Sequence, residues 1–228
     1  MSSDDGDKKL EGWVPSLEHV ALGGWAEVYE PAEDTFLMLD ALYKDRGRLR
    51  SLQPGLVVEI GPGSGVVSSY ACRLLKGSAW HLGIDVNAAA AEATVATAVA
   101  NDIFGLDAVR GDLLTCCSDK SIDVIIFNPP YVTTPDADVG SDTIEASWAG
   151  GLRGRRVIDR LLANETSLKR CLADDALVYL LLSAENCPGE VTETLKTQGF
   201  QVSTLLSRGA RNERLTVLRA SLSPLTSL

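Results

Sequence analysis

The sequence has little of what a zinc site or a disulfide framework requires. Its 228 residues include two histidines, His19 and His81, and five cysteines, none of which form a Cys-x-x-Cys pair. We therefore expect neither a structural zinc site nor a fold built on disulfides. The odd number of cysteines and the polar N-terminus, which lacks an apolar signal core, predict a cytoplasmic or nuclear protein.

Positive charge and long apolar runs are also scarce. The chain carries 21 Lys and Arg against 31 Asp and Glu, which gives a formal net charge of −10. Since binding to phosphate backbones depends on basic side chains, nucleic acid is not the expected partner, although a local basic patch is compatible with this charge. No run of about 18 apolar residues occurs, so we expect no membrane span.

The sequence does contain an alternation of strand-like apolar runs and helical patterns. Polar residues 1–12 predict a disordered tail, and residues 13–228 predict a single domain. This alternation is typical of an α/β domain with a mainly parallel sheet. The predicted strands, the last two of them an antiparallel pair, are 56–60, 80–84, 108–111, 122–127, 177–182, 200–206 and 215–219.

Apolar residues at helical spacing predict the helices between these strands. We expect helices after Pro31, over 66–75, after an N-cap at Asn87, over 157–172, and between Pro188 and Gly199. The stripes expected to face the core are Ala32, Phe36, Leu39 and Tyr43 in the first helix, Val95, Val99 and Ile103 in the third, and Val157, Leu161, Leu168 and Leu172 in the fourth.

A glycine-rich turn directly follows the first predicted strand, in Glu59-Ile-Gly-Pro-Gly-Ser-Gly65. Glycines such as Gly61 and Gly63 let a ligand approach the backbone closely. A dinucleotide-binding loop needs one more residue before its third glycine, and Glu59 is unfavourable beside a phosphate. The turn therefore favours a cationic ligand without phosphate, such as S-adenosylmethionine, over a dinucleotide. A simple strand-to-helix turn is the alternative interpretation.

Polar residues also stand at the ends of the following strands. Asp85 is placed to bind ribose hydroxyls. Asp112 is placed to accept a hydrogen bond from the amino group of an adenine, and Leu113 beside it offers an apolar contact surface. Taken singly, each residue has another interpretation. Asp85 could be a negative charge that complements the dipole of the next helix, and Asp112 could be a solvated surface charge. Together with Glu59 and Asn128, they follow successive strands and predict a ligand site at one edge of the sheet.

Asn128-Pro129-Pro130-Tyr131 follows the fourth predicted strand. An amide nitrogen is a poor nucleophile because its lone pair is delocalised. The side-chain carbonyl of Asn128 and the backbone carbonyl of Pro129 can each accept one N–H of a planar NH₂ group and orient its lone pair. Pro130 stiffens the loop, and Tyr131 offers a ring to lie against the planar group. The motif predicts N-methylation, whereas prolines that merely end a strand are the alternative.

Four segments together resemble the HemK-type release-factor glutamine methyltransferases, and in particular their eukaryotic and archaeal branch. They are Tyr29-Glu-Pro-Ala-Glu-Asp-Thr-Phe36, Glu59-Ile-Gly-Pro-Gly-Ser-Gly65, Phe127-Asn-Pro-Pro-Tyr131 and Trp148-Ala-Gly-Gly151. The resemblance implies a class I methyltransferase (Rossmann-like) α/β fold: a mostly parallel seven-stranded sheet, the last strand antiparallel, with helices on both faces. It also implies N5-methylation of the glutamine in the Gly-Gly-Gln motif of a class I translation release factor.

The same resemblance implies roles for individual residues, with S-adenosylmethionine as cofactor, S-adenosylhomocysteine as product and no metal in this chain. The residues implied to contact the cofactor are Thr35, Glu59, Gly61, Gly63, Asp85, Asp112, Leu113 and Asn128. The residues implied to be catalytic are Asn128, Pro129, Pro130 and Tyr131.

The resemblance further implies an obligate heterodimer with a small zinc-binding activator subunit. A short, fairly apolar edge strand is predicted between Leu106 and Leu114, and an uncovered edge strand is a natural pairing surface. Bacterial relatives carry an N-terminal helical substrate-binding domain, for which too little chain precedes Tyr29.

One position departs from the family pattern. Where the family has Asp or Asn before the next glycine, this chain has Arg153, and Arg155 and Arg156 follow it at a predicted helix start. The cluster is either a solvated surface or a patch for an acidic or RNA-bound partner, so the contacts of the 132–154 loop stay open. The alternatives for function are methylation of a histone lysine or of DNA adenine N6, and a non-catalytic scaffold subunit.

Overall fold

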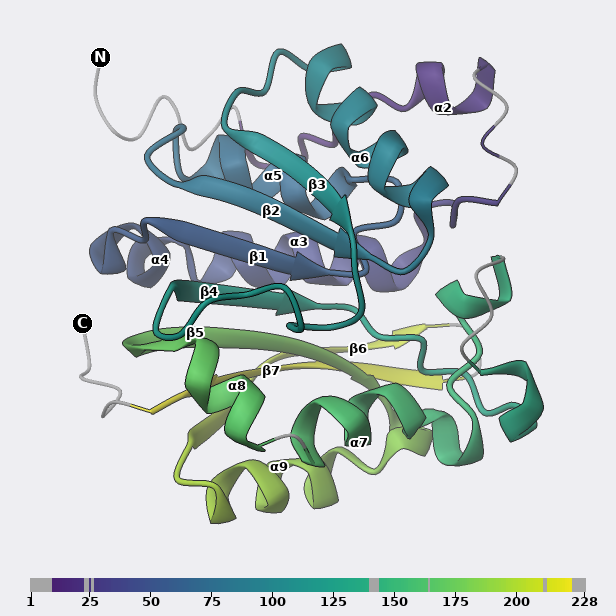
Figure 1. Ribbon diagram of the computed structural model, residues 1–228, viewed down its shortest axis with the longest axis vertical. Coiled ribbons are helices and arrows are strands. Elements are labelled where there is room, and N and C mark those ends of the chain that lie inside the picture. The colour runs from purple at the N-terminus through teal and green to yellow at the C-terminus, as the bar shows by residue number, and fades with distance from the viewer. Residues whose placement is uncertain are drawn as a thin grey trace.

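A seven-stranded sheet crosses the computed structural model in the order β3-β2-β1-β4-β5-β7-β6 (Figure 1). The first five strands are parallel to one another, and β7 lies antiparallel between β5 and β6. The strands are β1 (Leu56–Ile60), β2 (Trp80–Asp85), β3 (Leu106–Arg110), β4 (Ile122–Phe127), β5 (Leu172–Ser183), β6 (Gln201–Ala210) and β7 (Glu213–Ser221). The predicted α/β sheet with its last strand inserted antiparallel is confirmed.

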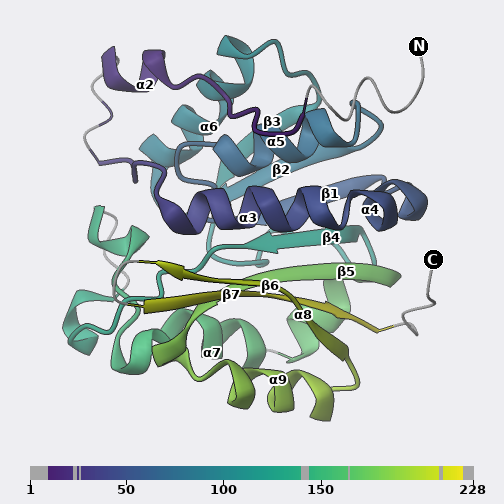
Figure 2. The same cartoon turned by 180° about the vertical axis from the view of Figure 1, so that it is seen from behind.

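Helices cover both faces of this sheet. They are α2 (Glu18–Leu22), α3 (Glu33–Lys44), α4 (Arg46–Leu52), α5 (Val66–Leu74), α6 (Ala88–Ala100), α7 (Arg156–Ala163), α8 (Glu165–Cys171) and α9 (Pro188–Thr197). In Figure 2, α3 and α4 lie in front of the sheet, where they share one apolar core with α5. The second core, on the opposite face, joins the sheet to α7, α8 and α9.

The central strands are apolar on both faces because both faces are covered. In β4, Val124 and Ile126 belong to the core under α3 and α5, whereas Ile125 and Phe127 belong to the core under α7. A parallel strand covered on both sides reads as a continuous apolar run rather than as an alternation. Packing on both faces holds β4 in place up to Phe127, and the Asn-Pro-Pro-Tyr loop begins at the next residue.

The structure describes residues 10–22, 25, 27–139, 144–163, 165–210 and 213–222. Most of the predicted disordered tail, residues 1–9, lies outside the described residues. Leu10, however, is buried in the core shared with α3 and α5. Close by, Trp13 stacks on Tyr70 with ring centroids 6.1 Å apart, and the guanidinium of Arg73 lies 3.9 Å from the Trp13 ring. The packed part of the chain therefore includes Leu10, ahead of the predicted boundary.

The buried faces of two helices differ from those predicted, in α3 only in part. In α3, Leu39 is buried and Tyr43 packs against the core as predicted, but Phe36 is 39% exposed and Leu37 and Met38 are fully buried. In α6, Val99 is 72% exposed, and Ile103 lies beyond the end of the helix. The buried residues of α6 are Ala90, Ala91, Ala93, Thr94, Thr97 and Ala98. The stripe prediction for α6 was wrong because this helix packs through small side chains, which allow close approach, rather than through its larger apolar ones.

The helix predicted over 157–172 is also interrupted. The structure has two helices, α7 and α8, and Leu172 opens β5 instead of continuing a helix. Consequently β5 begins five residues before the predicted 177. None of the helices in the described ranges combines the length and apolar character that crossing a bilayer requires.

Candidate functional site

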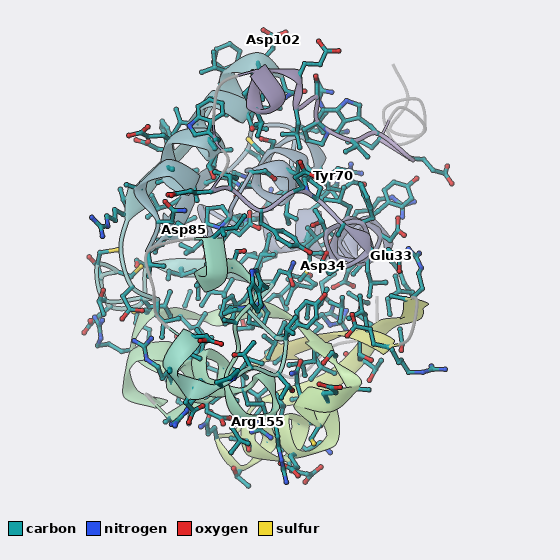
Figure 3. The ribbon with its side chains drawn as sticks, turned by 90° about the vertical axis from the view of Figure 1, so that its right-hand side faces the viewer. Glu33, Asp34, Tyr70, Asp85, Asp102 and Arg155 are labelled. Atoms are coloured by element: carbon teal, nitrogen blue, oxygen red, sulfur yellow. The ribbon has the colours of Figure 1, made fainter. Side chains whose placement is uncertain are left out.

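A cleft opens where β1, β2 and β4 end, and it is the place where the predicted site residues meet. The cleft is lined by every residue predicted to contact a cofactor: Thr35, Glu59, Gly61, Gly63, Asp85, Asp112, Leu113 and Asn128. Pro130 also lines it. Figure 3 shows Asp34 and Asp85 in the middle part of the molecule, with Asp102 above them and Arg155 below.

The glycine turn takes a conformation that only glycine adopts easily. Gly61, Gly63 and Gly65 have φ angles of 65°, 54° and 77°. At Gly65 packing adds a second requirement, because a Cβ there would lie 2.6 Å from the Cα of Thr94 in α6. The third glycine, which is placed one residue too early for a dinucleotide loop, thus serves the close contact between the turn and α6.

Asp85 ties this turn to the following helix. It is buried, and its Oδ2 accepts a hydrogen bond of 3.2 Å from the backbone N–H of Gly63. Its Oδ1 accepts one of 2.9 Å from the N–H of Asn87. Asn87 in turn caps α6 as predicted, accepting from the N–H of Ala89 at 2.9 Å. Burial raises the pKa of Asp85, and these backbone N–H groups oppose that rise.

Glu59 is a buried carboxyl at the floor of the cleft. The hydroxyl of Ser68 donates a hydrogen bond to its Oε2. Burial raises the pKa of Glu59 to about 8; the bonds from Ser68 lower it and the charge of Asp85 raises it further. A cation that entered the cleft would favour the ionised carboxylate, so the position suits a positively charged ligand.

Asn128 has one half of its amide engaged and the other half free. Its Nδ2 donates a hydrogen bond of 2.9 Å to Oδ2 of Asp34, which is buried at the start of α3. Its Oδ1 is buried and has no hydrogen-bond partner among the described residues. Because buried polar atoms are nearly always paired, this oxygen is placed to accept a hydrogen bond from a ligand.

Asp34 and Tyr29 are site residues that the sequence analysis did not identify. The hydroxyl of Tyr29 donates to the two carboxylate oxygens of Asp34 at 3.3 and 3.4 Å, and both residues line the cleft. Burial, followed by the charge of Asp34, raises the pKa of Tyr29 well above its ordinary value. Both residues belong to the Tyr29-to-Phe36 segment, in which only Thr35 was given a role. The sequence signal that could have identified Asp34 is its position directly before Thr35 in this segment.

Asp112 is less open than predicted. Its carboxylate pairs with Arg160 of α7 at 2.5 Å, and both side chains are about half exposed. Leu113 beside it takes a left-handed φ of 51°. Arg160 also lines the cleft and was not predicted. A ligand that approached Asp112 would therefore meet an ion pair rather than a lone carboxylate.

The remaining residues of the predicted catalytic motif differ in position. Tyr131 is half-buried and packs against the core beneath α3. Burial, followed by the charge of Asp34, raises its pKa well above the ordinary value. Pro129 and Tyr131 do not line the cleft within the described residues, whereas Asn128 and Pro130 do.

The arginine cluster is held by ion pairs. Arg155 pairs with Asp159 at 2.7 Å and with Glu190 at 2.8 Å. Arg153 pairs with the same Glu190 at 3.4 Å. Arg156 pairs with Asp136, and this arginine lowers the pKa of the Asp136 carboxyl to about 2. The three arginines are thus engaged in ion pairs within the protein, an arrangement that the sequence analysis did not consider. Among the described residues, no group of three or more His, Cys, Asp or Glu is arranged to hold a metal ion.

Comparisons with known proteins identify methyltransferase relatives of this chain. A family profile described as the methyltransferase small domain matches residues 34–149. Over 210 residues the chain is 42% identical to Methyltransferase HEMK2 of Homo sapiens, covering 90% of this chain and 95% of that protein. Over 222 residues it is 36% identical to the eRF1 methyltransferase catalytic subunit mtq2 of Schizosaccharomyces pombe, with 90% and 94% covered.

A solved structure supports the same grouping. A chain of the E. cuniculi Mtq2-Trm112 complex, described as responsible for methylation of the translation termination factor eRF1, superposes with a TM-score of 0.64. It is 29% identical in sequence, and the match covers 86% of this chain and 99% of that one. With its seven-stranded sheet, its strand-end cleft and these relatives, the chain belongs to the family of S-adenosylmethionine-dependent methyltransferases that includes HEMK2 and Mtq2.

Proposed function

We propose that this methyltransferase methylates the side-chain amide nitrogen of the glutamine in the Gly-Gly-Gln motif of a class I translation release factor. The observation that carries the proposal is the buried Oδ1 of Asn128 just after β4, which has no hydrogen-bond partner in the part of the chain that the structure describes. The amide nitrogen of Asn128 is already engaged with Asp34, so its oxygen is free to accept an N–H. Two relatives whose names specify eRF1 as their substrate support this acceptor.

The cleft suits S-adenosylmethionine, which supplies an electrophilic methyl group. The buried carboxyl of Glu59 favours a cationic ligand, and the turn around Gly61 and Gly63 brings backbone within reach of it. Asp85 retains acceptor capacity for hydroxyl groups beyond its two backbone bonds. The residues that we propose to hold the cofactor are Thr35, Glu59, Gly61, Gly63, Asp85, Asp112, Leu113 and Asn128.

The chain's own residues then have to hold the acceptor amide. Asn128 Oδ1 accepts one N–H of the acceptor, and the backbone carbonyl of Pro129, the next residue, accepts the other. Two acceptors on one NH₂ group fix its plane and stabilise positive charge as it develops on nitrogen. The buried carboxylate of Asp34, one hydrogen bond behind Asn128, adds to that stabilisation. The proton is released after methyl transfer, so no general base is required.

We infer that a small zinc-binding activator subunit pairs with β3, which lies at an edge of the sheet as predicted. Large apolar side chains are exposed around this strand. Phe104, just before β3, is 82% exposed, and Trp80, at the start of the neighbouring β2, is 72% exposed. Val109 within β3 and Val99 near the end of α6 are exposed as well. Apolar side chains beside an unpaired edge favour the addition of a partner strand. The Mtq2-Trm112 complex of E. cuniculi supports the presence of a partner subunit.

The experiment uses labelled S-adenosylmethionine and the chain co-expressed with a candidate activator. The substrates are a release factor, its Gly-Gly-Gln→Gly-Gly-Asn variant, a histone peptide and an adenine-containing DNA duplex. Label on the intact release factor alone, lost in Asn128→Ala, is the expected result. Label only on the histone or the DNA would overturn the proposed acceptor. A protein that binds no cofactor would instead be a scaffold.

A further inference from the structure

The buried side-chain amide of Asn186, which lies outside the cleft, hydrogen-bonds both the Asn-Pro-Pro-Tyr loop and the 148–154 segment. Asn186 is the last residue of the short 3-10 helix η4 (Ala184–Asn186), which follows β5, and it is completely buried. Its Nδ2 donates to the backbone carbonyls of Tyr131 and Arg153, each at 2.9 Å, and to that of Gly154 at 3.3 Å. Its Oδ1 accepts from the N–H of Ser183 at 2.7 Å.

This pattern of bonds requires an amide. Two N–H groups serve three carbonyl oxygens, while the side-chain oxygen serves a backbone donor. A carboxylate at position 186 would keep the bond from Ser183 but would turn an acceptor toward all three carbonyls. Removing the side chain would leave those three carbonyls without this donor.

Glycines allow the two loops to approach this closely. A Cβ at Gly154 would overlap the carbonyl oxygen of Tyr131, and a Cβ at Gly150 would lie 2.5 Å from the carbonyl oxygen of Pro130. The two loops are also joined directly. Val132 donates its N–H to the carbonyl of Trp148 at 3.0 Å, and the N–H of Gly150 donates to the carbonyl of Val132 at 2.8 Å. The backbone of the Asn-Pro-Pro-Tyr motif therefore rests against the 148–154 segment, with Asn186 as their shared donor.

The position of this anchor matters for the acceptor. On one side, Asn128 follows β4, whose last residue Phe127 is paired with Leu180 of β5. On the other side, Tyr131 is held by Asn186. The carbonyl of Pro129 lies between these two fixed points, and fixed φ angles at both prolines transmit the anchoring along the loop.

We propose that Asn186 is a positioning residue: it holds the Asn-Pro-Pro-Tyr loop so that Asn128 Oδ1 and the Pro129 carbonyl receive both acceptor N–H groups together. This inference rests on the proposed function. Misplacement of a catalytic group by about 1 Å can cost about 100-fold in rate. Loss of Asn186 should therefore reduce turnover at saturating substrate and leave cofactor affinity nearly unchanged, because Asn186 does not line the cofactor cleft within the described residues.

The test compares Asn186→Ala and Gly150→Ala with Asn101→Ala, all in the complex with the activator. Asn101 is a matched control, since its side-chain amide makes a similar number of hydrogen bonds at the end of α6, away from Asn128. Its Nδ2 donates to the carbonyls of Ser16 and Thr97, and its Oδ1 accepts from the N–H of Ser16. We expect kcat to fall about 10- to 100-fold in the first two variants, with cofactor Kd within about twofold of wild type. Asn101→Ala should lose thermal stability and keep its kcat.

A second readout does not depend on turnover. Hydrogen exchange at the Val132 and Gly150 amides should accelerate in Asn186→Ala and stay unchanged in Asn101→Ala. Wild-type kcat together with wild-type protection of these amides in Asn186→Ala would overturn the proposal. If the wild-type complex methylates no release factor, the proposed function fails, and the exchange rates alone decide whether Asn186 holds the loop.

Discussion

Asp34 and Asn128 are 94 positions apart in the sequence and share a hydrogen bond of 2.9 Å, in which the amide nitrogen of Asn128 donates to the carboxylate of Asp34. This single bond decides which end of the Asn128 amide faces the cleft. Since the nitrogen is occupied, the oxygen is presented to the acceptor. A carboxylate accepts only, whereas an amide at position 34 could bond either end of Asn128.

The first prediction concerns Asp34. Asp34→Ala leaves the part-buried nitrogen of Asn128 without its partner, which should cost about 1–3 kcal/mol of stability and permit the amide to flip. We expect kcat to fall by roughly tenfold or more, since an orienting interaction contributes about that much. Thermal unfolding and single-turnover methylation measure the two effects. Tyr29→Phe is the control, because it removes only two long bonds to Asp34 and should have a smaller effect. Wild-type turnover in Asp34→Ala would show that Asn128 is oriented without this carboxylate.

The glycine turn permits a matched comparison. Gly61→Ala forces a left-handed φ of 65° on alanine but meets no atom of the described residues within 4 Å, so it should cost about 1–2 kcal/mol. Gly65→Ala has a similar φ of 77° and in addition brings its Cβ to 2.6 Å from the Cα of Thr94, so it should cost clearly more. Denaturant unfolding of the cofactor-free protein measures both free energies. Equal costs would mean that α6 moves aside freely.

Glu59 should make stability depend on pH. Its pKa is raised from 4.5 to about 8 by burial, so between these values the folded protein keeps a proton that the unfolded chain has lost. The contribution of Glu59 is therefore complete below about pH 4.5 and is lost as the pH rises to about 8. Thermal unfolding of cofactor-free protein across this range should show the decline, and Glu59→Gln should remove it. An unchanged slope in Glu59→Gln would assign the decline to another group.

Cofactor binding should be linked to the same proton. A cationic ligand favours the ionised carboxylate, so binding should release a proton near neutral pH and tighten as the pH approaches about 8. Calorimetric titrations in two buffers of different ionisation enthalpy measure the proton count. Identical apparent enthalpies in both buffers would contradict the linkage.

His81 should have the opposite effect on the acid side. It is buried in β2, its Nε2 has no partner among the described residues, and burial lowers its pKa from 6.5 to about 4. The unfolded chain binds the proton first, so this contribution is present above pH 6.5 and is lost as the pH falls to about 4. His81→Leu should raise the melting temperature most at acidic pH, because it removes both the titration and an unsatisfied polar atom. A uniform change across pH would contradict this account.

The exposed residues beside β3 should matter for the activator and not for the cofactor. Phe104→Ser and Val109→Lys should weaken association with a co-expressed activator by about tenfold or more, since they remove apolar contact and place charge on the pairing edge. Leu152→Ser is the control, because Leu152 is also strongly exposed but lies in η3 (Leu152–Gly154), away from β3. Affinity measured with the purified activator distinguishes the three variants. Equal binding by all of them would place the interface elsewhere.

The strand-end residues could be predicted from the sequence because of a general property of parallel sheets. Once β1, β2 and β4 were recognised as buried parallel strands, Glu59, Asp85 and Asn128 had to meet at one edge. The glycine turn and the Asn-Pro-Pro-Tyr motif are local, so their chemistry is also visible in the order of residues. The sequence alone thus determined the fold class, the place of the cleft and the strand-end residues that line it, whereas Tyr29, Asp34 and Arg160 were recognised only in the structure.

Long-range packing decided the rest. The bond from Asn128 to Asp34 and the bond from Asn186 to Tyr131 join segments 94 and 55 positions apart. No local pattern identifies such partners, because a buried amide is satisfied by whichever group the fold brings beside it. The buried face of α6 was mispredicted for a related reason: periodicity follows the largest side chains, whereas a helix beside a tight turn packs through its smallest ones. Which end of an amide faces the ligand, and which loop supports it, therefore depends on the tertiary structure.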